Sequence, residues 1–104
     1  MNRLAFEMNL YPNCAEEYKR RHDEIWSELS RLLKKAGIKD YVIFLDEETN
    51  ILFATLKVTH VKDFNMLPAL EIMQNWWVYM SDIMETNSDH SPISKNLTEL
   101  FYLA

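Results

Sequence analysis

Tyr18 and His22 are the two side chains whose types and spacing in this sequence best suit proton transfer. They lie one helical turn apart in an apolar stripe, so both point inward from the same face of a predicted helix. An imidazole has a reference pKa near 6.5 and can give or take a proton around neutral pH. A histidine in such a place either lines a pocket or is a buried structural residue with a hydrogen-bond partner, and the structural alternative is the commoner one.

Trp76 and Trp77 are the second indication of a pocket. Adjacent helical residues point about 100° apart, so the two indoles cannot fill the same place in the core. We expect one to pack and the other to line a cavity. An indole face suits the C–H face of a sugar, whose hydroxyls need a few scattered hydrogen bonds. Tyr41 opens a predicted strand and can direct its phenol to the same cavity, although core filling by both tryptophans is the alternative.

Metal, phosphate and nucleophile chemistries find little support in the sequence. His22, His60 and His90 fall in three different predicted elements, and Cys14 has no partner motif, so we expect no metal site. The single glycine, Gly37, stands at a predicted helix end, which leaves no glycine-rich phosphate loop and no nucleophile elbow.

Length, charge and cysteine content narrow the class of protein. The chain has 104 residues, which suits a single domain over residues 1–104. A formal net charge of −5 argues against nucleic acid or an anionic membrane as partner, so a small neutral ligand or another protein is expected. The lone cysteine cannot close an internal disulfide, and the first residues lack a signal-peptide pattern, so we expect a soluble cytoplasmic protein.

Hydrophobic periodicity predicts the elements of the first half. Apolar side chains alternate over residues 4–10, which predicts a strand with one apolar face. Asn13 followed by Glu16 resembles a capping box, and one helix should run from there to about Ala36. Gly37 can take the left-handed position that closes this helix. Residues 39–46 and 51–58 are short and rich in β-branched and aromatic residues, and they should form a hairpin with a loop of four or five residues.

The second half predicts a bent helix and a last strand. Residues 61–84 should be helical with one bend at Pro68, residues 85–96 should form a long polar loop, and residues 97–103 should form the final strand. The order β-α-β-β-α-β indicates the ferredoxin-like α+β fold, with both helices on one sheet face. The other face also carries apolar side chains, so we expect a homodimer with the two sheets face to face, a dimeric α+β barrel.

Several segments together resemble the L-rhamnose mutarotase family. They are residues 17–22 (EYKRRH), 25–29 (IWSEL), 76–80 (WWVYM), Asn87 with Ser91 and Pro92, and residues 100–103 (LFYL). The likeness covers the whole chain. It departs at Ser27, where proline is common, and at His90, where asparagine is expected.

The resemblance implies an enzyme that interconverts the α and β anomers of L-rhamnose, in the cytoplasm, as a homodimer and without a cofactor. It also implies that His22 is the proton donor and that Tyr18, Tyr41, Trp76 and Trp77 bind the sugar. The fold alone leaves other functions open, because the same architecture serves as a non-catalytic ligand-binding or regulatory module and as a monooxygenase.

Overall fold

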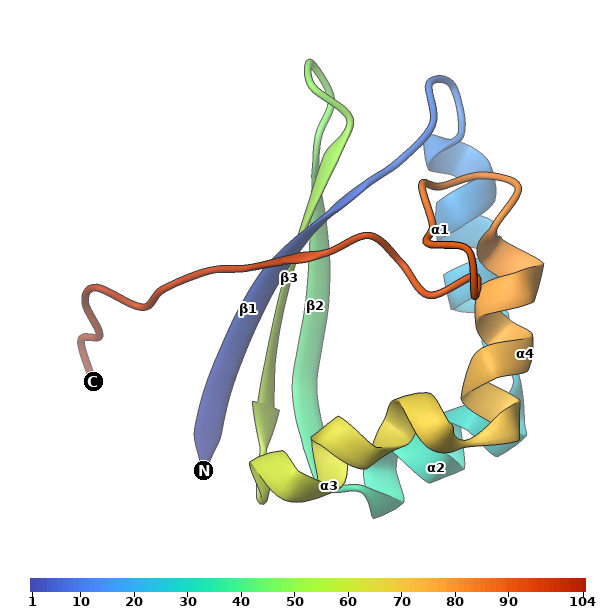
Figure 1. The fold of residues 1–104 in the computed structure, drawn as a ribbon. Helices are drawn as coiled ribbons and strands as arrows, with labels where there is room; N and C mark the ends of the chain where they lie inside the picture. The colour runs from blue at the N-terminus through green and yellow to red at the C-terminus, as the bar shows by residue number, and fades with distance from the viewer.

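One antiparallel sheet of four strands forms the backbone of the computed structural model, which describes residues 1–104 (Figure 1). The strands lie in the order β2-β3-β1-β4, which is the ferredoxin-like arrangement that the sequence predicts. Their bounds are Asn2–Asn9 for β1, Ile38–Asp46 for β2, Ile51–Val58 for β3 and Lys95–Asn96 for β4. The hairpin of β2 and β3 and its short loop are confirmed.

The inner face of the sheet carries the core. The central strand β3 buries Leu52, Ala54, Leu56 and Val58, which alternate with half-exposed residues that point to the other face. Met8 of β1 pairs with Leu52 and adds to the same layer. The period of two in the sequence therefore sorts these strands into an inner and an outer face.

The helices all cover the inner face of the sheet, as Figure 1 shows. They are α1 (Ala15–Asp23), α2 (Ser27–Lys35), α3 (Val61–Met66), the 3₁₀ turn η1 (Leu67–Ala69) and α4 (Glu71–Met80). Pro68 lies in η1 between α3 and α4, so the predicted bend at this proline is confirmed. None of these helices combines the length and the apolar character that a membrane crossing demands.

The prediction of one continuous helix up to Ala36 is wrong. The helix breaks between α1 and α2, and Trp26 there adopts φ −55° and ψ 130°, an extended backbone. The reason is tertiary packing, because the Trp26 ring meets the Trp76 ring edge-on at 5.1 Å and lies 5.5 Å from the Tyr79 ring. These contacts outweigh the loss of the helical hydrogen bonds at the break.

The predictions for the start and the end of this helical region differ in their success. The predicted capping box is wrong, because Asn13 has φ +63°, the N-cap is Cys14, and no side chain caps the helix. The predicted stop is confirmed, because Gly37 has φ +83° and its N–H donates to the Lys34 carbonyl at 3.0 Å. A residue with a side chain is strained in that left-handed conformation.

A β-bulge in β2 turns Tyr41 inward. Lys39 pairs with Lys57 and Val42 with Thr55, so both Asp40 and Tyr41 lie opposite the single residue between them, Leu56. Asp40 absorbs the extra residue with φ +50°. The bulge thereby restores the alternation, and Tyr41 faces the helices as Ile43 does.

The last strand differs from its prediction over residues 97–103. Only Lys95 and Asn96 form β4, opposite Glu7 and Phe6 of β1, and the chain beyond Leu97 leaves the sheet (Figure 1). The residues at 100–103 are all apolar, so they lack the alternation that would bury one face of an edge strand. Leu100 is 92% exposed and Phe101 is 78% exposed.

Candidate functional site

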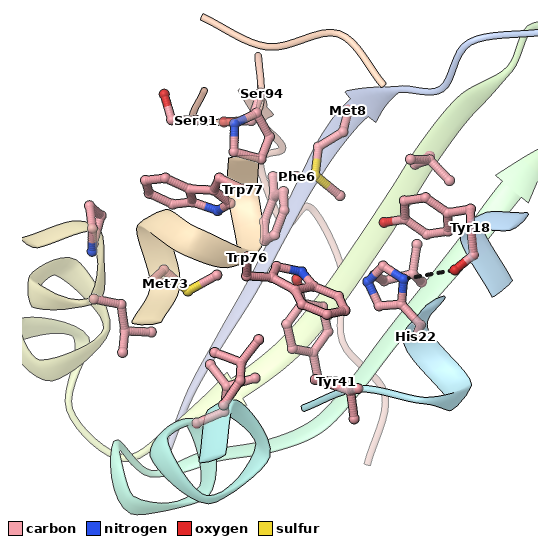
Figure 2. A pocket seen from close by; sticks show the side chains of 18 of the residues that line it. Phe6, Met8, Tyr18, His22, Tyr41, Met73, Trp76, Trp77, Ser91 and Ser94 are labelled. Carbon is pink, nitrogen blue, oxygen red and sulfur yellow. Dashed lines mark hydrogen bonds between the residues drawn. The ribbon is translucent and has the colours of Figure 1, made fainter. Parts of the chain in front are cut away.

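A cleft of about 1390 Å³ lies between the inner face of the sheet and the helix layer. Its lining comes from β1, β2, β3, all the helices and the loop after α4, and most of the lining residues are apolar. A recess of about 70 Å³ that shares part of this lining is bordered by Tyr18, His22, Tyr41, Trp76 and Trp77 together. The structure therefore brings all five candidate residues to one place (Figure 2).

His22 is held by a hydrogen bond within its own helix. Its Nδ1 lies 3.0 Å from the carbonyl oxygen of Tyr18, and this contact is the dashed line in Figure 2. A carbonyl only accepts, so Nδ1 carries a proton and Nε2 is left for a ligand. Burial lowers the pKa of His22, against the opposing effect of the Tyr18 carbonyl, so the imidazole is mostly neutral at neutral pH.

The phenols of Tyr18 and Tyr41 are held in the protonated form. Tyr18 is buried, its ring stacks on the His22 ring at 4.3 Å, and burial raises its pKa. Burial of the phenol raises the pKa of Tyr41 to about 12. Tyr41 as a whole residue is nevertheless 40% exposed, because the cleft around it is open. Both phenols are therefore hydrogen-bond donors to any ligand with oxygen atoms.

The two tryptophans have different surroundings. Trp76 is buried, and its ring meets the His22 ring edge-on at 5.4 Å. Trp77 is half-buried and lies on the other side of Trp76 from His22, beside Met73 (Figure 2). One indole thus packs against the histidine and the other forms a wall of the cleft, as the adjacent positions predict.

The loop after α4 contributes polar side chains to the lining of the cleft. The Asn87 amide donates to the Ser91 hydroxyl at 2.9 Å, and the Ser91 N–H donates to Asp89 at 2.9 Å. Asn87, Asp89, Ser91 and Ser94 all line the cleft. These short-range bonds hold the polar side chains of the loop in one arrangement beside the cleft.

Several residues around the site were not singled out from the sequence. Met8 and Met73 line the recess. From the sequence, methionine side chains at these positions predict core packing and do not indicate a pocket. Arg21 is buried behind the site, although charged side chains are rarely buried in proteins. The close contact of Trp26 with Trp76 depends on the helix break, which no local pattern shows.

Fold and site together define a ferredoxin-like α+β protein with an aromatic cleft, in which His22 lies among two tyrosines and two tryptophans and His90 borders the recess. The family model of the L-rhamnose mutarotases matches residues 3–103. The chain belongs to the L-rhamnose mutarotase family.

Relatives of the same name support this membership over the full length. The chain is 51% identical to the L-rhamnose mutarotase of Sinorhizobium fredii, over 100% of both chains, and 47% identical to that of Escherichia coli O157:H7, over 99% of both. The crystal structure of an L-rhamnose mutarotase from Formosa agariphila superposes with a TM-score of 0.94 at 47% identity, over 100% of both chains. A dimeric ferredoxin-like protein from an uncultured marine organism shares the fold alone, with a TM-score of 0.53 at 17% identity, over 97% of this chain and 96% of that one.

Proposed function

We propose that His22 transfers the protons by which this chain, an isomerase, interconverts the α and β anomers of L-rhamnose. The observation that carries this role is the hydrogen bond from Nδ1 to the Tyr18 carbonyl, because it fixes the tautomer and leaves Nε2 for the sugar. No other imidazole is held in this way among the three histidines of the chain.

The reaction needs two proton transfers at oxygens bonded to one carbon. Ring opening removes the proton from the anomeric hydroxyl O1, forms the C1=O1 double bond, breaks the C1–O5 bond and places a proton on O5. Rotation about C1–C2 then presents the other face of the aldehyde, and the reverse steps close the ring as the other anomer. General acid–base catalysis of such transfers contributes about 10²- to 10⁴-fold.

The neutral state of His22 suits it to begin as the base. Its lowered pKa leaves Nε2 unprotonated at neutral pH, so Nε2 first takes the proton of O1. The imidazolium then donates that proton to O5. Because O1 and O5 are both bonded to C1, one nitrogen atom can serve each in turn.

The other four residues bind the sugar in this proposal. The protonated phenols of Tyr18 and Tyr41 donate hydrogen bonds to sugar oxygens, since the raised pKa of Tyr41 makes it a poor base. Trp76 and Trp77 offer indole faces to the C–H groups and to the methyl group of the six-deoxy sugar.

The test is the His22→Ala variant, compared with His60→Ala as a matched control outside the cleft. Exchange NMR between the two anomeric protons of L-rhamnose measures the rate, and a titration followed by NMR measures binding. We expect His22→Ala to lose about 10²-fold or more of the rate per folded molecule, with binding nearly unchanged and only a small fall in melting temperature from the lost ring contacts. His60→Ala should behave like the wild type.

A variant that is destabilised but exchanges at the wild-type rate per folded molecule would show that His22 is structural. Sugar binding without any exchange in the wild-type protein would instead point to a binding module of the same fold.

We also propose that the chain forms a homodimer through the outer face of its sheet. Phe44 of β2 is 63% exposed on that face and Val42 is 42% exposed, and the helices leave the face uncovered (Figure 1). Phe44→Glu should shift the sedimentation of the protein toward the monomer, whereas Met66→Glu, an equally drastic change on α3, should not. An unchanged sedimentation coefficient for Phe44→Glu would place any interface elsewhere.

A cytoplasmic location is the last part of the proposal. It is supported by the single Cys14, which is a free thiol in the structure and is compatible with a reducing compartment. Fractionation of cells that express the protein, followed by immunodetection, tests this location.

A further inference from the structure

Arg21 is the one charged residue buried in this chain, at 9% exposure, and the proposed mechanism does not use it. It follows Arg20 and directly precedes His22 on α1, but it does not line the cleft. Burying a guanidinium is costly unless its N–H groups are satisfied. Its partners therefore show what this arginine does.

The guanidinium of Arg21 ties α1 to the end of α4. Its Nη1 donates to the Tyr79 carbonyl at 2.7 Å and to the Asp82 carboxylate at 2.8 Å, and its Nη2 donates to the other Asp82 oxygen at 3.2 Å. Its Nε donates to Glu17 one turn earlier on α1 at 2.7 Å. The Tyr79 carbonyl lies in the last turn of α4, where carbonyls lack partners within the helix, so Arg21 caps α4.

The same side chain also fixes the aromatic rings behind the site. The guanidinium carbon of Arg21 lies 4.6 Å above the centre of the Tyr79 ring. The Tyr79 ring is 5.5 Å from the Trp76 ring, and the Trp76 ring is 5.4 Å from His22. Two neighbouring residues of α1 thus meet two residues of α4 that are one turn apart, Trp76 and Tyr79, in a closed set of contacts.

We propose that Arg21 is a positioning residue that holds His22 against Trp76 by clamping α1 to the end of α4. The inference rests on the proposed role of His22. A fixed distance between α1 and α4 affects the rate only if His22, the residue that it positions, takes part in the reaction. The guanidinium of Arg21 is planar, binds the Asp82 carboxylate with two nitrogens and stacks on the Tyr79 ring. These contacts fix the orientation of the two helices as well as their distance. Lysine keeps the positive charge but lacks the planar group with two nitrogens. A lysine substitution therefore separates the effect of the charge from the effect of the geometry.

The first test is Arg21→Lys, with Arg31→Lys as the matched control. Arg31 lies exposed on α2 and takes part in no ion pair. We expect Arg21→Lys to lower kcat about 10-fold or more with KM changed by less than about 3-fold, since small displacements of a reacting group cost this much in rate. Arg31→Lys should leave both constants unchanged.

A second readout reports the site itself. The pKa of His22, followed through its ring protons by NMR, should rise toward its ordinary value in Arg21→Lys, because the loosened contact with Trp76 admits water. The charge of residue 21 is kept in this variant, so the change would come from hydration and not from a lost cation.

Asp82→Asn keeps the proposal testable if the Arg21 variant fails to fold. Asp82 is largely exposed, so its amide form should fold, while the weakened pair with Arg21 should lower kcat by about 3-fold. Full kcat per folded molecule and an unchanged His22 pKa in both variants would overturn the positioning role. If His22→Ala also kept its rate, the proposed function of His22 would fail separately, so the two failures can be told apart.

Discussion

Replacing Trp76 and Trp77 one at a time by phenylalanine separates a residue that supports the histidine from one that only lines the cleft. The Trp76 ring makes contacts with His22, Trp26 and Tyr79, at 5.4, 5.1 and 5.5 Å between ring centres. Trp77 takes part in no such ring pair. The two substitutions remove the same atoms from adjacent positions, so each is the control for the other.

The contacts set the expected loss of stability. Aromatic pairs contribute about 0.5 to 1.5 kcal/mol each beyond the area they bury, so the three pairs together contribute at most about 4.5 kcal/mol. Phenylalanine keeps part of each contact, and we expect Trp76→Phe to lower the free energy of unfolding by about 1 to 3 kcal/mol. Trp77→Phe should cost less than about 1 kcal/mol, because the ring is half-exposed and unpaired.

The assays are urea unfolding followed by far-ultraviolet circular dichroism, and anomer exchange by NMR. All variants must be compared at one protomer concentration, because association adds to apparent stability. Trp76→Phe should lower kcat, since the histidine loses its neighbour, whereas Trp77→Phe should mainly raise KM. Equal losses of stability in the two variants, or a larger one in Trp77→Phe, would refute the division of roles.

Three further outcomes follow from the structure. The pKa of His22 is lower in the folded than in the unfolded protein, because burial disfavours the charged imidazole. Its contribution to stability is therefore present above about pH 6.5 and is lost as the pH falls through the folded pKa. The difference in unfolding free energy between wild type and His22→Ala should shrink over that range. Gly37→Ala places a Cβ 2.9 Å from the Thr59 hydroxyl at φ +83°, so urea unfolding should show a loss of about 1 to 3 kcal/mol, part of which Thr59→Ala restores. Asn87→Ala removes the amide that holds Ser91, and KM should rise about 3-fold or more while the melting temperature stays within about 2 °C.

Elements with local signals could be predicted from the sequence. The hairpin strands, the bend at Pro68 and the stop at Gly37 each depend on residues inside the element or next to it. The same holds for Tyr18 and His22, since their shared direction follows from helical spacing alone.

Features that depend on distant partners could not be predicted. The helix break at Trp26 allows its ring to contact Trp76 of α4. Arg21 is buried where it binds Asp82, which lies 61 residues further along the chain. The polar surroundings of such an arginine are assembled only by the fold. The final strand is predicted at 97–103, after its observed place at Lys95–Asn96, because the apolar residues 100–103 are typical of a strand in composition but lack the alternation that a sheet edge requires.

The extended residue between α1 and α2 fixes the length of the chain at that point. One inserted or deleted residue between Glu24 and Trp26 would change the span of this extended connection by about 3.5 Å and would move Trp26 away from Trp76 and Leu29 out of its place in the core. Surface loops accept changes in length, but this short connection has no such freedom. Homologous sequences should therefore align across it without a gap, even where their loops after α4 or at the hairpin differ in length.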